Sequence, residues 1–250
     1  MTRASWTEST SCSTRAGQPG VRLSGSDGFS AYVEQNVLVT QRLLEAAKGS
    51  PSLQRFVFAS SSSVYGNVAS FPTTEEQVPS PHSPYGVTKL AAEHLCGLYA
   101  ANWGVPTVAL RYFTVYGPRQ RPDMAIHRLI ESALTQTPFL LYGDGPAVRD
   151  FTYVGDVVAA TVAAAHAPVS PGTVANVAGG GSCSMAELIE MTQEVVGLEI
   201  PLDRGPTQAG DVERTGGSIE AAARLLGWKP EVTLREGVEA QAAWHRSRRS

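Results

Sequence analysis

The sequence has few of the features that mark secreted, metal-bound or membrane proteins. Its three cysteines (Cys12, Cys96 and Cys183) are widely spaced and form no CxxC pair, which argues against a disulfide framework or a zinc site. No apolar run is long enough to span a membrane, and the N-terminus lacks the apolar segment of a signal peptide. The net charge is −3, so neither nucleic acid nor a membrane surface is expected as a partner. We therefore expect a cytoplasmic protein with reduced thiols and without a bound metal ion.

The remaining composition is that of a globular protein, with 42% hydrophobic residues among 250, enough to bury a large core. Three short apolar runs, at residues 55–59, 107–113 and 174–177, are typical of buried parallel strands. Residues 30–47 and 85–102 carry apolar positions at helical spacing. Because strands and helices alternate, the pattern predicts an α/β fold with a doubly wound parallel sheet.

The first of these helices should bury one stripe of its surface, formed by Val33, Val37, Thr40, Leu44 and Ala47. The second helix should end at Gly104, which is followed by Pro106.

Composition also suggests where the chain divides. Eight of residues 1–14 are Ser or Thr without periodicity, so residues 1–15 are expected to be disordered or foreign to the fold. Residues 16–113 carry the strand and helix pattern of the sheet domain. Residues 114–250 are expected to form a smaller α/β lobe, interleaved with the sheet domain. Two capping boxes, at 184–187 and 233–236, predict helices at 188–196 and 234–245.

The strongest chemical signal is Tyr85-Gly86-Val87-Thr88-Lys89 at the start of the second helix. Positions four apart lie on one helical face, so the Lys89 ammonium can approach the Tyr85 phenol. A nearby positive charge lowers the pKa of a tyrosine toward the range of a general base. The spacing alone also occurs by chance in helices without any catalytic role.

Further motifs follow the predicted strands. Four serines at 60–63 precede Val-Tyr-Gly directly after the first strand, which places hydroxyls at the carboxyl edge of the sheet, where open α/β folds bind ligands. The strand at 107–113 continues into Thr114-Val115-Tyr116-Gly117-Pro118, and Arg149-Asp150-Phe151-Thr152-Tyr153 occurs later.

In this set and order of motifs, the chain from about Ala16 to Trp244 resembles the extended short-chain dehydrogenase/reductases of the NAD-dependent epimerase/dehydratase type, which act on nucleotide sugars. The resemblance implies an NAD cofactor, a Rossmann-like sheet and a C-terminal lobe for the sugar nucleotide. It implies Tyr85 as general base, Lys89 as the residue that holds the nicotinamide ribose, and Ser61 as the hydroxyl that bonds the reacting sugar. Tyr112 would lie beside the nicotinamide.

For the substrate, the resemblance implies contacts from five residues: Arg22, Ser62, Thr114, Arg149 and Asp211. Arg149 would contact the diphosphate and Asp211 the nucleotide ribose. Arg22 could face a sugar carboxylate. Gln208 departs from the galactose-type epimerases, which have an arginine three residues before the Asp.

The family's 4,6-dehydratases carry an acidic pair at the positions of Ser62 and Ser63, and its decarboxylases usually have a Glu at the second. With two serines, the resemblance favours 4-epimerisation of UDP-glucuronate or UDP-glucose, with the uronate slightly ahead. A dehydratase or decarboxylase remains the alternative enzyme, and a catalytically dead sugar-nucleotide-binding protein the alternative class. The resemblance also implies a homodimer built by the helices at 30–47 and 85–102.

One family element is absent from the printed sequence, which contains no GxxGxxG segment after an apolar strand. Such a segment lets main-chain N–H groups approach the pyrophosphate of the cofactor. The resemblance places residues 16–18 at the end of the family's fourth strand, so the sheet is expected to be incomplete. Without that cradle, residues 1–250 alone are expected to bind NAD poorly.

Overall fold

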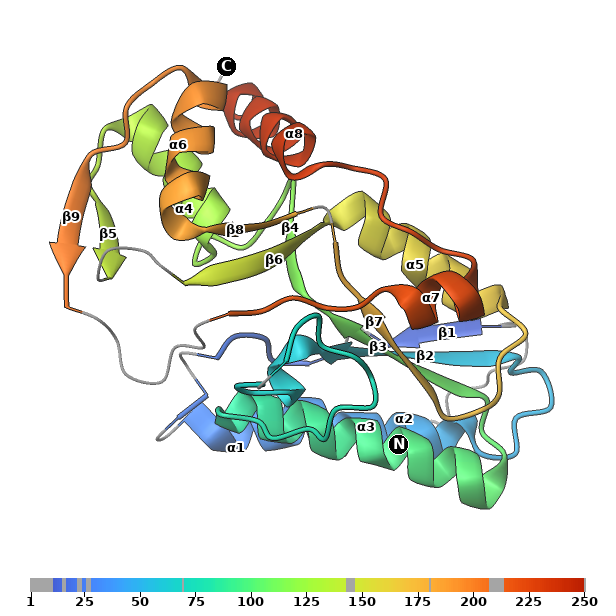
Figure 1. The fold of residues 1–250 in the computed structure, drawn as a ribbon. Helices are drawn as coiled ribbons and strands as arrows, with labels where there is room; N and C mark the ends of the chain where they lie inside the picture. Colours follow the sequence, from blue (N-terminus) through green and yellow to red (C-terminus); the bar gives the residue numbers. More distant parts are fainter. Residues whose placement is uncertain are drawn as a thin grey trace. The chain divides into compact units, whose positions relative to one another are not determined.

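The computed structural model describes residues 11–14, 17–21, 24–25, 28–68, 70–142, 147–179, 181–206 and 214–249. The chain forms two compact units, each assembled from several stretches of sequence (Figure 1). Unit 1 comprises residues 1–112, 158–177 and 217–229, and unit 2 comprises residues 113–157, 178–216 and 230–250. No helix in the described part of the chain is long and apolar enough to cross a membrane.

Unit 1 is built on a parallel sheet of four strands in the order β1-β2-β3-β7, which confirms the predicted fold class. The strands are β1 (Ser11–Thr14), β2 (Arg55–Ser61), β3 (Thr107–Tyr112) and β7 (Thr173–Val177). Phe56, Val57 and Phe58 in β2 are all buried, because helices cover both faces of a parallel sheet.

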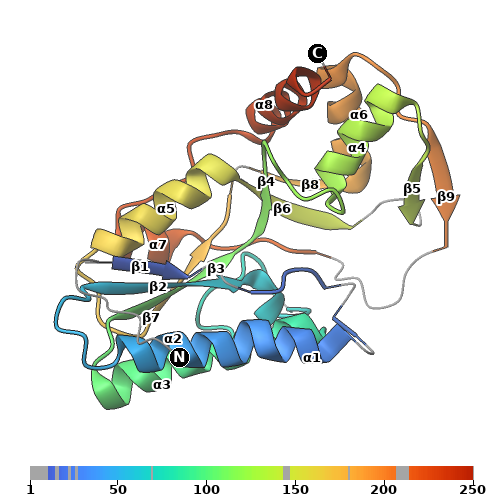
Figure 2. The ribbon, with the colours of Figure 1, turned by 180° about the vertical axis from the view of Figure 1, so that it is seen from behind.

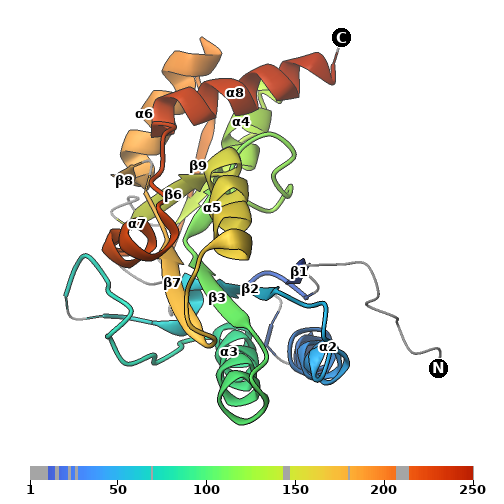
Figure 3. The same ribbon diagram turned by 90° about the vertical axis from the view of Figure 1, so that its right-hand side faces the viewer.

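Helices lie on both faces of this sheet (Figure 3). One face carries α1 (Phe29–Tyr32), the π-helical η2 (Val33–Leu38), α2 (Val39–Ala47) and α3 (Pro84–Trp103); the other carries α7 (Glu220–Leu226) and most of α5 (Val154–His166). From behind, α2 and α3 are seen to run side by side (Figure 2). Ser83 caps α3 by accepting from Gly86 N, and Gly104 ends it in the left-handed conformation, as predicted.

The predicted stripe on the first helix is correct in its second half and wrong in its first. Thr40, Leu44 and Ala47 are buried, whereas Val33 and Val37 are half-buried. The buried positions before Thr40 are Tyr32 and Asn36 instead. The reason is that residues 33–38 form a π-helix, whose wider turn keeps positions four apart on the buried face.

Residues 11–14 also differ from the expectation for the Ser/Thr-rich start. They form β1, which pairs in parallel with β2, Ser11 opposite Arg55 and Thr14 opposite Phe58. Main-chain hydrogen bonds to a neighbouring strand form whatever the side chains are, so composition is a poor guide there. Residues 1–10 and 15 lie outside the described part.

Unit 2 contains two small sheets and three helices. β4 (Thr114–Tyr116) pairs in parallel with β6 (Val148–Tyr153), which pairs antiparallel with β8 (Ser182–Ser184), and β5 (Phe139–Tyr142) pairs with β9 (Leu202–Gly205). The helices are α4 (Ala125–Thr135), α6 (Met185–Val196) and α8 (Leu234–Ser247). Both predicted capping boxes are present, at Ser184 and Thr233.

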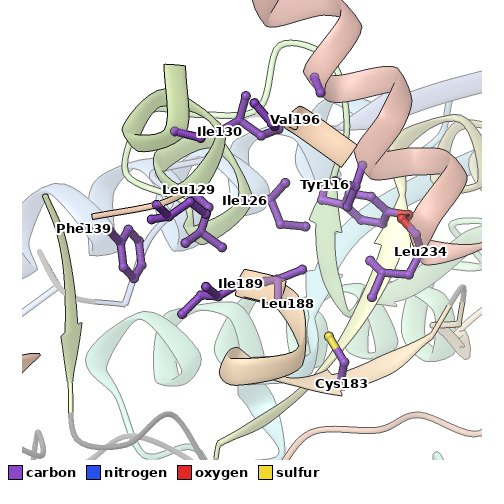
Figure 4. Packing of buried hydrophobic residues seen from close by; sticks show 14 of the residues in the cluster. Tyr116, Ile126, Leu129, Ile130, Phe139, Cys183, Leu188, Ile189, Val196 and Leu234 are labelled. Atoms are coloured by element: carbon purple, nitrogen blue, oxygen red, sulfur yellow. Dashed lines mark hydrogen bonds between the residues drawn. The ribbon is translucent and has the colours of Figure 1, made fainter. Parts of the chain in front are cut away.

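The core of unit 2 fills the space between these helices and the β4-β6-β8 sheet (Figure 4). Side chains of α4 (Ile126, Leu129 and Ile130) point toward those of α6 and α8 in this cluster. Unit 1 has a separate core between β2 and the helices α2 and α3.

Candidate active site

The first turns of α3 carry the predicted catalytic pair. Tyr85 and Lys89 lie on one face of this helix, four residues apart. Tyr85 is half-buried, and the ring of Tyr32 on α1 stands edge-on to it with centroids 6.1 Å apart. The Lys89 side chain is buried, with Nζ 4.5 Å from the centre of the Phe58 ring on β2. Tyr85 therefore lies against α1, and Lys89 lies against the sheet.

Lys89 is a buried cation without a bonded acceptor in the described part of the chain. Burial lowers its pKa from 10.5 to about 8, although Cys96 and Glu93 act in the opposite direction. Its Nζ lies near Gly17, where an added Cβ would be 4.0 Å away. A buried ammonium of this kind can donate to hydroxyls of a bound molecule, as the family assignment of a ribose-binding lysine requires.

Asn36 is a buried polar residue beside the candidate site that the sequence analysis missed. Its side chain is buried, accepts from Gln18 N (2.8 Å) and donates to Gln18 O (3.2 Å) and Thr88 Oγ1 (3.0 Å). Asn36 therefore ties the segment after β1 to the turn of α3 that precedes Lys89. The regular helical spacing expected from the sequence left position 36 outside the buried stripe, and only the π-helical turn places it there, where a buried amide needs partners.

The serine turn lies next to the start of α3. Ser61 ends β2 and caps η3 (Ser62–Val64), its Oγ accepting from Ser63 N at 3.2 Å. Gly86 lies against the Ser63 carbonyl, since an added Cβ would stand 2.4 Å from that oxygen. This contact holds Ser61 and Ser62 beside the helix turn that carries Tyr85. Ser61 still has its own O–H to donate.

Tyr112 ends β3, and its hydroxyl is 2.8 Å from Thr161 Oγ1 on α5. Its assignment to the nicotinamide remains a prediction. The residue before it, Arg111, is buried in a polar network with Glu93 and Tyr65.

The remaining predicted residues belong to unit 2 or lie outside the described residues. Thr114 on β4 is opposite Phe151, two positions after Arg149 on the neighbouring β6, so Thr114 and Arg149 share one small sheet. Arg149 is half-buried, with Nη1 donating to Val148 O at 3.1 Å. Arg22 and Asp211, like Gln208, are not among the described residues.

One cluster in unit 2 was not expected from the sequence, which predicts no metal ion. Ligand atoms of His127, Glu131 and His245 lie within 4.8 Å of one another. The Glu131 carboxylate is already bonded to His245 Nδ1 (2.6 Å) and Arg249 Nη2 (2.5 Å). We therefore interpret the cluster as an ion-paired link between α4 and the end of α8.

Residues 13–178 match the NAD dependent epimerase/dehydratase family. The chain belongs to this family. The prediction made from the sequence motifs is thereby confirmed.

Relatives in the family have been described as epimerases. The uncharacterized UDP-glucose epimerase YtcB of Bacillus subtilis is 42% identical over 226 residues, 90% of this chain and 71% of YtcB. A probable UDP-glucuronate 4-epimerase of Rhizobium meliloti is 34% identical over 249 residues, 92% of this chain and 72% of the relative.

A solved structure has the same fold. The UDP-glucuronic acid 4-epimerase of Bacillus cereus, in complex with UDP-glucuronic acid and NAD, is 43% identical with a TM-score of 0.89. The match covers 93% of this chain and 74% of that protein.

Proposed function

We propose that the protein is an NAD-dependent 4-epimerase of UDP-sugars, with UDP-glucuronate ahead of UDP-glucose as substrate. The observation that carries the proposal is that Tyr85 and Lys89 share one face of α3 on helix turns held against the Ser61 turn, and that the buried Lys89 has no bonded acceptor among the described residues. Membership of the NAD dependent epimerase/dehydratase family and the names of the relatives support the same reaction.

The described residues fit the nicotinamide ribose end of NAD. Lys89 presents a buried ammonium in need of acceptors, and Gly17 lies beside it, where an added Cβ would stand 4.0 Å from Nζ and 2.7 Å from Asn36 Oδ1. We assign Lys89 and Tyr85 to the ribose and Tyr112 to the neighbourhood of the nicotinamide ring. NAD supplies a hydride acceptor and donor for C4, so that the hydride can return to the opposite face of a transient 4-keto sugar.

Side chains of the protein transfer the proton of the C4 hydroxyl. Tyr85, deprotonated with help from the Lys89 charge, takes the proton of the C4 hydroxyl and later returns it. Ser61 donates its O–H to the oxygen at C4 and orients it. Lys89 remains charged throughout, so that it favours the phenolate form of Tyr85.

The serine turn after β2 favours epimerisation over elimination or decarboxylation. Ser62 and Ser63 leave no carboxylic acid on the turn after β2, where the dehydratases of the family have an acidic pair. For the uronate, we assign Arg22 to the sugar carboxylate, with Ser62 and Thr114 as further sugar contacts. Arg149 and Asp211 are assigned to the diphosphate and the nucleotide ribose.

We also propose a cytoplasmic homodimer that pairs the α1–α2 segment and α3 with their copies. Large apolar side chains are exposed on these helices, including Leu38, Val87, Leu98 and Trp103. Burying such a surface against a second copy removes apolar area from water. The buried free thiols of Cys96 and Cys183 suit a reducing compartment.

The function is tested by incubating the protein, at the full length that its gene encodes, with NAD and either UDP-glucuronate or UDP-glucose. Proton NMR of the sugar nucleotides should show conversion to the C4 epimer, faster for the uronate. A 4-keto-6-deoxy sugar or released carbon dioxide would instead identify a dehydratase or decarboxylase. Binding of the sugar nucleotide without bound NAD and without turnover would support the catalytically dead alternative.

A further inference from the structure

A buried ion pair lies below the candidate site in unit 1. Arg111 on β3 meets Glu93 on α3 through two bonds, Nε to Oε2 at 3.1 Å and Nη2 to Oε1 at 2.5 Å. Both side chains are only 6% exposed. Ser60 on β2 adds a third bond, donating its hydroxyl to Glu93 Oε2 at 2.6 Å.

The pair belongs to a longer chain of buried hydrogen bonds. Arg111 Nη1 donates to the hydroxyl of Tyr65 at 2.7 Å, and Tyr65 donates to Asn176 Oδ1 on β7 at 2.8 Å. Asn176 in turn donates from Nδ2 to Thr73 O at 3.0 Å. The carboxylate of Glu93 is thus held by Arg111 and Ser60, and Arg111 is in turn fixed by its hydrogen bond to Tyr65.

Stability alone does not explain why such a pair is present. Removing two charges from water costs several kcal/mol per ion, and apolar side chains of similar volume often do as well or better. The neighbours of Glu93 on α3 indicate a second role for its charge.

Glu93 stands one helical turn after Lys89, and two turns after Tyr85, on the same face of α3. Its negative charge acts to keep Lys89 protonated against the cost of burial. Cys96, on the following turn, has a pKa raised by burial to about 12, so this thiol is neutral at working pH.

Other charged or titratable groups come from the elements packed against α3. They are Arg111 on β3, Arg55 on β2, Tyr65 after η3, Tyr32 on α1, Glu34 on η2, and Arg42 and Glu45 on α2, the last bonded to Tyr99 and paired with Lys48. Two groups raise the pKa of Lys89, Cys96 and Glu93, and of these Cys96 is a neutral thiol whereas Glu93 is the carboxylate paired with Arg111.

We propose that Glu93 is a positioning residue for the reaction, which acts through Lys89 by keeping its ammonium charged while Arg111 and Ser60 hold the carboxylate in place. Lys89 lacks an acceptor of its own in the described structure, so the charge of Glu93 partly offsets its burial. The proposal rests on the proposed function for its meaning, but its test needs no substrate.

The test is the titration midpoint of Lys89 in the full-length protein. The printed sequence contains three lysines, Lys48, Lys89 and Lys229. Reductive methylation with ¹³C-formaldehyde gives each a resolvable NMR signal, assigned with the Lys48→Arg and Lys229→Arg variants. The midpoint is then compared among four variants and the parent protein.

Two variants remove the negative charge, Glu93→Gln alone and Glu93→Gln together with Arg111→Gln. The double variant removes the carboxylate together with its guanidinium partner, so Arg111 is not left buried and unpaired, and it serves if the single variant does not fold. Two controls keep the charge: Glu93→Asp retains the carboxylate, and Ser60→Ala loses one hydrogen bond only.

We expect the midpoint of Lys89 to fall below about 8 in both charge-removing variants, by less in the double variant because the Arg111 cation is lost too, and to stay near 8 in both controls. A fall of one pH unit reduces the charged fraction at pH 8 about fivefold, and NAD affinity measured at that pH should weaken accordingly. No fall in either charge-removing variant, or an equal fall in Ser60→Ala, would overturn the proposal. Failure of the epimerase assay would leave this titration unaffected, so the two proposals fail separately.

Discussion

Gly86 lies directly against the main-chain carbonyl of Ser63, so closely that a Cβ atom at position 86 would stand 2.4 Å from the oxygen. The helix that carries Tyr85 and Lys89 therefore starts in contact with the turn that carries Ser61. Only glycine fits at this contact, unless one of the two segments moves.

Replacing Gly86 by alanine should force the start of α3 away from the Ser61 turn. A displacement of about 1 Å can cost about 10²-fold in rate, so we expect kcat to fall by one to two orders of magnitude while the circular dichroism spectrum is retained. Gly97 on the same helix is the control, because nothing lies within 4 Å of its added Cβ. Gly97→Ala should keep full activity and stabilise the fold by about 0.5–1 kcal/mol. Equal activity of the two variants would show that the contact does not position the site.

Tyr85→Phe should remove the general base and lower kcat by about 10²–10⁴-fold. The measurement is the initial rate of sugar conversion with saturating NAD. Tyr99→Phe, also on α3 but bonded to Glu45 and far from the first turns, is the matched control and should keep near-normal turnover. Normal turnover by Tyr85→Phe would place the base elsewhere.

Lys89→Met should stabilise the protein while abolishing NAD binding. The pKa of Lys89 is about 8 when folded and 10.5 as a model value, so the unfolded state binds more protons between these pH values. The free energy of unfolding should therefore rise with pH between 8 and 10.5. At pH 7, burying the charged Lys89 side chain lowers the free energy of unfolding by about 3 kcal/mol.

Urea unfolding at pH 7 without NAD should show Lys89→Met to be more stable than the parent, with a smaller change for the exposed Lys48→Met. The advantage of Lys89→Met should shrink as pH approaches 10.5. A destabilised Lys89→Met at pH 7 would mean that the ammonium has stabilising partners.

The link between α4 and α8 should make unit 2 sensitive to acid. Burial lowers the pKa of His245 below 6.5, with His127 and Arg249 adding to the effect, although Glu131 opposes it. The unfolded state therefore binds more protons, and stability is lost as pH falls below about 6.5.

Glu131 loses its contribution at lower pH still, because His245 and Arg249 hold its pKa below 4.5 against the effect of burial. We expect His245→Gln to flatten the fall in Tm between pH 7 and pH 5, while the exposed His166→Gln leaves it unchanged. An undiminished fall in His245→Gln would assign the acid sensitivity to another group.

The proposed dimer predicts that a charge on the exposed face of α3 separates the subunits. Leu98 is 47% exposed, so Leu98→Glu should leave each subunit folded and shift light scattering from dimer to monomer. Val162→Glu on α5, where Val162 is 55% exposed, is the control and should remain dimeric. A parent protein that is monomeric at micromolar concentration would contradict the proposal.

The parts of the fold that depend on neighbours along the chain could be predicted from the sequence. Apolar runs located β2, β3 and β7, and Gly104 marked the end of α3, because strand and helix patterns are set within one or two turns. The Tyr85–Lys89 pair could be predicted for the same reason, since positions four apart share a helical face in any fold.

The distant residues that surround the site could not be predicted from the sequence, because packing brings them together. Asn36 reaches Thr88 across 52 residues, and Arg111 reaches Tyr65 across 46. The π-helical turn that brings Asn36 to the buried face replaced the regular spacing on which the sequence prediction relied. Such contacts depend on how helices and strands pack, and a buried polar group accepts whichever partner that packing brings within reach.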